Sequence, residues 1–180
     1  MESTITYFGE PGEHNTERVF DLVDRAMQEE GITKVVLAST RGGTAVHAMD
    51  RYKGRDVRLI ILPHQYGTRA EQRFPDALVE RARREGHVVH FATMPFAMGK
   101  LFGFSIGSAV ADFLRVFCQG FKVCVELVLI AGDAGLVGVG EKVIVVAGTG
   151  RGADTAMVAT GATTWNLKDL HVSRILCKPL

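Results

Sequence analysis

Short apolar runs alternate along the chain with stretches in which apolar residues recur every three or four positions. The runs Lys34–Ala38, Val57–Leu62 and Lys142–Ala147 have continuously apolar centres, which is typical of strands buried on both faces. The helical period is clearest from Thr16 onward, with Thr16 as the expected N-cap and Gly31 as the expected end. This alternation predicts an α/β fold built from βαβ units, with a mostly parallel sheet and helices on both of its faces.

The remaining elements fit the same scheme. Further strands are expected at Ile5–Phe8, His87–Phe91, Thr155–Ala159 and Val172–Cys177. Further helices are expected from Gly42 and Gly43 onward, from Pro75 as the first helical residue, over Ile106–Phe117 and over Phe121–Ala134. The chain has 180 residues and no repeat or linker, so residues 1–180 are predicted to form a single domain.

Composition narrows the possible partners. The net charge is +1 and no basic stripe runs along the chain, which argues against a nucleic-acid partner. Three cysteines without a C-x-x-C pair argue against a disulfide framework or a zinc ribbon, and indicate a cytoplasmic protein. Residues 1–9 do not resemble a signal peptide. Glu126 and Asp133 interrupt the most apolar segment, Val123–Val139, so no membrane span is expected.

The segment after Lys34–Ala38 is the first candidate for a binding site. Ligands of open α/β sheets lie beyond the carboxyl ends of the strands. Here Ser39-Thr40-Arg41-Gly42-Gly43-Thr44 leads into a helix. Small residues let the backbone approach a ligand, and the free N–H groups of the helix start, the hydroxyls and Arg41 favour an anion. The alternative is a tight turn between strand and helix with a capping hydroxyl.

A second glycine-rich segment, Gly148 to Thr155, follows Lys142–Ala147. It matches G-x-G-x-x-A superficially, but the dinucleotide fingerprint requires a following helix, and a strand is expected here instead. We interpret the segment as a second anion-binding loop with Arg151 as its charged residue. The alternative is a plain glycine-rich turn.

Two further loops follow predicted strands. His64 follows Val57–Leu62 and is a candidate general acid or base, because its ordinary pKa lies near neutrality; the alternative is a surface residue. The segment Thr93–Lys100 contains Met94, Phe96 and Met98, which could pack on a planar ligand or cover the core. His87 and His90 lie on opposite faces of a strand, so no metal site is expected.

These loops resemble parts of a known domain. Ser39 to Ala45 resembles the effector-phosphate loop of the C-terminal α/β domain of pyruvate kinase, and Gly148 to Thr155 resembles a later glycine-rich turn of that domain. The similarity is greater to archaeal-type stand-alone proteins that are similar to this domain. The shared motifs are Asn15-Thr16, Gln119 to Glu126, Asp133 to Gly135 and Gly150 to Thr155, in this order.

The resemblance implies a three-layer α/β/α fold with a mostly parallel sheet and one antiparallel edge strand. It implies no pyruvate kinase activity, because that chemistry belongs to a barrel domain which this short chain lacks. Arg41 stands where the family often has Ser, and Gly43 where it often has Arg, so Arg41 is expected to replace that cation. The predicted ligand contacts from both lines of reasoning are Asn15, Ser39, Thr40, Arg41, Gly42, Gly43, Thr44, His64, Gly150, Arg151, Gly152, Asp154 and Thr155.

Three functions follow as hypotheses. The first is binding of a phosphorylated small molecule, such as a nucleotide, flavin mononucleotide (FMN) or a sugar phosphate. The second is an enzyme that acts on a phosphorylated metabolite, with His64 as acid or base. The third is a regulatory or interaction module, with a homo-oligomer as the default expectation for a soluble protein.

Overall fold

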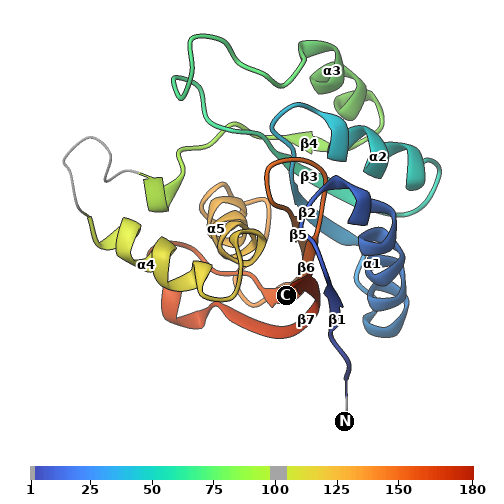
Figure 1. Ribbon diagram of the computed structural model, residues 1–180. Helices are drawn as coiled ribbons and strands as arrows, with labels where there is room; N and C mark the ends of the chain where they lie inside the picture. Colours follow the sequence, from blue (N-terminus) through green and yellow to red (C-terminus); the bar gives the residue numbers. More distant parts are fainter. Residues whose placement is uncertain (1–2, 98–104) are drawn as a thin grey trace.

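Seven strands form one sheet in a computed structural model that describes residues 3–97 and 105–180 (Figure 1). The strands are β1 (Thr6–Phe8), β2 (Lys34–Ala38), β3 (Arg58–Leu62), β4 (Val88–Val89), β5 (Lys142–Ala147), β6 (Thr155–Thr160) and β7 (His171–Pro179). Their order across the sheet is β1-β7-β6-β5-β2-β3-β4. The helices are α1 (Thr16–Glu30), α2 (Gly43–Arg51), α3 (Asp76–Arg84), α4 (Ile106–Arg115) and α5 (Gln119–Asp133).

The antiparallel part of the sheet lies toward one edge but is not the edge itself. β6 runs antiparallel to both of its neighbours, β5 and β7, and the remaining strand pairs are parallel. The expected antiparallel edge strand is therefore an inner strand of the sheet. The reason is that β7 pairs along the outer side of β6. The short β1 then adds outside β7 in parallel, and the N–H of Leu180 donates to the carbonyl of Phe8 beside it (3.0 Å).

Helices cover both faces of the sheet, as the apolar runs predict. Figure 1 shows α1, α2 and α3 on one side of the strands and α4 and α5 on the other. Successive side chains of a strand point to opposite faces of the sheet, so each strand contributes alternately to two separate cores. On β2, Val35 and Leu37 pack with the first group of helices, whereas Val36 packs with the second. The same alternation on β3, β5 and β6 confirms an α/β fold with two buried layers.

Several predicted boundaries of strands and helices differ from those in the structure. The strand expected over His87–Phe91 is reduced to Val88–Val89, since it pairs only with β3 at the edge of the sheet. Thr16 is the first residue of α1 and not its N-cap; its hydroxyl donates to the carbonyl of Glu13 (2.7 Å). Pro75 has extended backbone angles and precedes α3 as its N-cap residue, so the helix starts one residue later than expected.

The central helix α5 lies almost entirely inside the protein. Its glycines permit close approach: a Cβ on Gly120 would stand 2.1 Å from Thr155 Oγ1, and one on Gly132 would stand 2.0 Å from the carbonyl oxygen of Ala162. Lys122 and Glu126 form a buried ion pair on this helix. Glu126 also accepts the N–H of Phe96 (3.0 Å), which ties α5 to the segment after β4.

α4 and the residue that follows it carry exposed apolar side chains, among them Ile106, Phe113 and Val116. Nothing in the structure tests self-association, so the homo-oligomer stays a prediction. In the two described stretches of the chain, every helix is too short or too polar to cross a bilayer.

Candidate functional site

A cleft of about 770 Å³ opens at the carboxyl ends of β2, β3 and β5. This volume is in the range of small-molecule sites, and the position is the one that open α/β sheets use for ligands. Four segments meet there: the start of α1, the segment between β2 and α2, the loop after β3 and the turn between β5 and β6. Figure 1 shows the last of these, in orange, beside the start of α1. The lining residues are Glu13, Thr16, Ala38, Ser39, Thr40, Arg41, Gly43, Thr44, His47, His64, Thr68, Arg69, Glu71, Gln72, Arg73, Gly148, Gly150, Arg151 and Gly152.

The segment between β2 and α2 supplies the floor of the cleft. Ser39 is buried, and its hydroxyl accepts the N–H of Ala45 (3.1 Å). Ser39 thereby caps the first turn of α2, which agrees with the capping-hydroxyl alternative. The N–H of Val46 bonds to the carbonyl of Gly42 (2.8 Å). The N–H groups of Gly43 and Thr44, at the first two positions of α2, precede the helical ladder and are available to an anion.

Gly42 shapes this segment without lining the cleft. It adopts φ 90°, and a Cβ there would stand 2.3 Å from Leu78 Cδ1 on α3. Both facts favour glycine. A residue with a side chain rarely adopts this backbone conformation, and its Cβ would collide with Leu78. Gly42 therefore lets α3 pack close to the start of α2.

The turn between β5 and β6 is fixed by a buried carboxylate. Asp154 has no exposed surface, and its Oδ2 accepts the N–H groups of Thr149 (2.9 Å) and Gly12 (3.1 Å). Its Oδ1 accepts the hydroxyl of Thr155 (2.7 Å). Asp154 and Thr155 thus lie behind the cleft and support its wall, instead of lining it as the resemblance implied.

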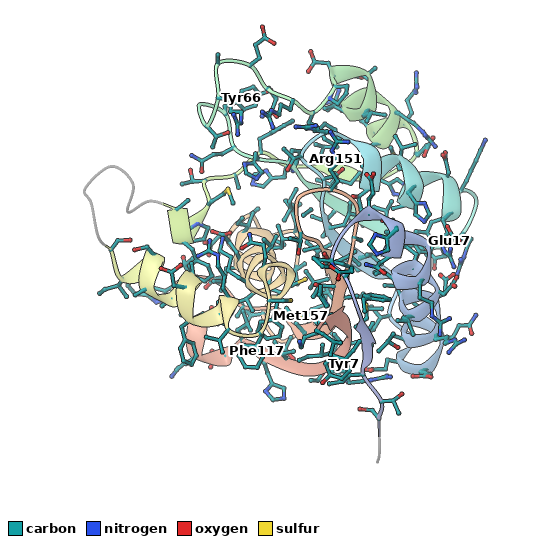
Figure 2. The ribbon with its side chains drawn as sticks, viewed as in Figure 1. Tyr7, Glu17, Tyr66, Phe117, Arg151 and Met157 are labelled. Carbon is teal, nitrogen blue, oxygen red and sulfur yellow. The ribbon has the colours of Figure 1, made fainter. Side chains whose placement is uncertain are left out.

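The same turn is clamped against α1. Gly152 has φ 64°, and a Cβ there would stand 2.5 Å from Glu13 Cα. The N–H of Ala153 donates to Thr16 Oγ1 (3.0 Å). The turn thus offers the cleft mainly the side chain of Arg151, which Figure 2 shows at the rim.

Asn15 also lies behind the cleft. Its side chain is buried, and its amide donates to the carbonyls of Glu10 (2.8 Å) and Gly12 (3.3 Å). The polar contact predicted for Asn15 thus goes to the protein's own backbone, and the neighbouring Thr16 lines the cleft in its place.

The long loop after β3 supplies residues that the sequence interpretation missed, above all Arg69 and Arg73. Gln72 braces this loop: its amide donates to the carbonyl of His64 (2.9 Å), and its side-chain oxygen accepts the N–H groups of Arg73 (2.8 Å) and Phe74 (3.1 Å). Phe74 is buried beneath it. The sequence did contain a signal for these two arginines, because both follow β3, which ends at the rim of the cleft.

The charge of the cleft is predominantly positive. Arg41, Arg69, Arg73 and Arg151 stand against only two acids, Glu13 and Glu71. Within residues 3–97 and 105–180, none of these four arginines forms an ion pair, whereas structural arginines such as Arg51 and Arg174 each bind two or more carboxylates.

The arginines also affect one another. Partial desolvation, followed by the charges of Arg69 and Arg41, lowers the pKa of the Arg73 guanidinium. Like charges gathered in one cleft repel one another, and the two acids Glu13 and Glu71 are fewer than the four arginines. An anionic ligand would relieve that repulsion.

Two histidines border the cleft. Desolvation lowers the pKa of His64 below its usual 6.5, and the positive charges of Lys122, Arg73 and Arg69 lower it further, against the opposing effect of Glu126. His64 is therefore neutral at pH 7 and able to accept a proton. His47 on α2 lies with its Nε2 3.5 Å from Glu17 Oε2.

The apolar segment that was considered as a platform for a planar ligand lies elsewhere. Residues 93–97 contribute nothing to the lining of the cleft, and Phe96 is buried in the core beside α5. Met98, Gly99 and Lys100 lie outside the described residues. Among the residues that the structure describes, no three histidine, cysteine or acidic side chains gather in a metal-binding arrangement.

The fold and the cleft together define an α/β protein with a cationic cavity at the carboxyl rim of its sheet. No protein-family model matches the sequence.

Proposed function

We propose that the cleft binds a small phosphorylated molecule, such as a nucleotide, FMN or a sugar phosphate, in a domain of the pyruvate kinase C-terminal type. The observation that carries this proposal is the set of four arginines around the first turn of α2, which form no ion pair within residues 3–97 and 105–180. Phosphate matches this arrangement because guanidinium groups and backbone N–H groups at a helix start are its usual partners. FMN is supported through its phosphate alone, since the described part of the Met94–Met98 stretch does not reach the cleft.

Calorimetric titration with inorganic phosphate tests the proposal. In the variant Arg41→Gln/Arg151→Gln, affinity is expected to fall by about tenfold or more, because charge-assisted hydrogen bonds contribute about 1.5–3 kcal/mol each. The matched control is Arg25→Gln/Arg84→Gln, which removes the same charge at exposed positions on α1 and α3. Equal loss in both double variants would show a general charge effect and refute the site.

The natural ligand is identified separately. Mass spectrometry and an absorption spectrum of the material released on denaturation are expected to show a phosphorylated compound. A flavin spectrum would select FMN, whereas an empty protein that also fails to bind added flavin would exclude it.

A second function, catalysis on the bound phosphorylated molecule, is favoured by one observation. His64 lines the same cleft as the arginines, and its pKa is lowered. If His64 acts as a general base, kcat/KM rises with pH through a pKa below 6.5 and then stays level. His64→Ala is expected to abolish turnover and leave phosphate affinity within about threefold, since a general base contributes about 10²–10⁴ in rate. The catalytic proposal fails if the variant turns over normally.

A further inference from the structure

The outward side of α4 presents a row of apolar side chains to solvent. Ile106, Phe113 and Val116 are 83%, 69% and 79% exposed, and Phe117, just beyond the helix, is 45% exposed. Residues seven and four positions apart share one face of a helix, so Ile106, Phe113 and Phe117 form a stripe, with Val116 beside it. We call these four residues the α4 stripe. Single exposed apolar residues are ordinary, whereas a contiguous exposed row indicates an interaction surface.

The opposite side of α4 attaches the helix to the rest of the protein. Ala111 is buried, and Val110 and Leu114 pack against the core that contains α5. Ser105 and Ser108 close the first turn with a capping box. The stripe is therefore displayed by a helix that is already ordered, which lowers the cost of association.

The charges beside the stripe indicate which partner fits it. α4 contains two charged residues, Asp112 and Arg115, which pair with each other on the exposed flank of the helix. One acid and one base give this flank no net charge. A helix that binds anionic lipid or nucleic acid carries a basic flank instead. Two copies of this neutral flank do not repel each other.

A two-fold axis makes the same two charges complementary. When two copies of α4 pack antiparallel, a given flank of one helix faces the same flank of the other. With the axis between positions 112 and 115, the acid of each copy lies opposite the base of the other copy. Phe113 then lies beside the axis, where its ring packs on the stripe of the second copy. An interface of this symmetry uses one self-complementary surface patch.

We propose that two copies of this chain associate through the α4 stripe, antiparallel across this axis. The stripe is roughly 18 Å long, at 1.5 Å for each helical residue, so the contact is smaller than the standard interface of about 1,600 Å². Association is therefore weak and depends on concentration, and the charges fix its register. Phosphate binding is not part of this inference. Figure 2 shows Phe117 far from Tyr66, which lies on the loop beside the cleft.

Sedimentation equilibrium over a series of concentrations tests the proposal. The unmodified chain of 19.6 kDa is expected to approach twice this mass as its concentration rises. Phe113→Glu is expected to raise the concentration needed for association by at least about tenfold, because it places two like charges near the axis. Tyr66→Glu is the matched control, since it adds the same charge at an exposed aromatic residue of the cleft loop. Circular dichroism verifies that both variants fold.

Exchanging the charges tests whether the partner is a second copy. Asp112→Arg leaves two bases on the flank and Arg115→Asp leaves two acids, so each variant alone is expected to associate less than the unmodified chain. In an equimolar mixture, every acid again faces a base. The mixture is therefore expected to associate at least about tenfold more tightly than either variant alone.

Three results would overturn the proposal. The first is a chain that stays monomeric up to about 1 mM, or one that grows beyond a dimer. The second is association of Phe113→Glu as strong as that of Tyr66→Glu. The third is a mixture of the charge variants that associates no more than each alone, because the two flanks would then not face each other.

Discussion

Replacing Asp154 with alanine is expected to lower the free energy of unfolding by about 3–5 kcal/mol. The carboxylate is fully buried and accepts hydrogen bonds from Gly12, Thr149 and Thr155. Truncation leaves these donors, one buried and two partly buried, without their acceptor, which costs about 1–3 kcal/mol for each. The three losses are not additive, because the neighbouring backbone relaxes.

Urea unfolding at pH 7 measures this loss. Asp112→Ala is the control, because among the described residues its exposed carboxylate pairs only with Arg115 on the same helix, and such pairs contribute less than about 1 kcal/mol. Asp154→Ala is also expected to weaken phosphate binding, since it loosens the turn that carries Arg151. If Asp154→Ala unfolds at the same urea concentration as the unmodified protein, the buried carboxylate does not hold the wall of the cleft.

Replacing Lys122 with methionine is expected to destabilise the protein by about 3–5 kcal/mol, because it leaves the buried carboxylate of Glu126 without its cation. Both side chains are almost fully buried. The ammonium of Lys122 lies 5.6 Å from the centre of the Phe96 ring, and methionine, which is close to lysine in length, fills the same space beside that ring. The loss is therefore mainly electrostatic.

The double variant Lys122→Met/Glu126→Gln separates charge from packing. Glutamine keeps an oxygen that accepts the N–H of Phe96 and removes the unpaired charge, so most of the lost stability is expected to return. Thermal or urea unfolding of the four proteins in this cycle gives the coupling energy. A double variant as unstable as Lys122→Met alone would show that the charge pair is not the cause.

The alternating apolar pattern was sufficient to predict the fold class. β2 and β5 match the expected boundaries because a fully buried strand is apolar along its whole length. The length of β4 was overestimated, because an edge strand ends where its backbone pairing ends and not where the apolar residues end. The inner position of β6 follows from its pairing with β7 on the outer side, and the apolar pattern that predicted both strands does not indicate which strands pair.

The candidate site was predicted in part. Ser39, Thr40 and Arg41 line the cleft because their position after a parallel strand determines the rim that they reach. The roles of Asn15 and Asp154 could not be predicted, because Asp154 bonds to Gly12, 142 positions away in sequence, and Asn15 satisfies backbone carbonyls of its own loop. Arg69 and Arg73 were missed because their position after β3 places their loop at the rim but does not indicate which side chains of so long a loop turn toward the cleft.

The most direct test of the central claim is a phosphate titration followed by ¹H–¹⁵N NMR. The account predicts that the amide signals of Gly43 and Thr44 shift progressively and saturate, while that of Val139, exposed between α5 and β5, stays in place. Signals at the start of α2 that remain unmoved at millimolar phosphate, or that move no more than Val139, would contradict a phosphate site in this cleft.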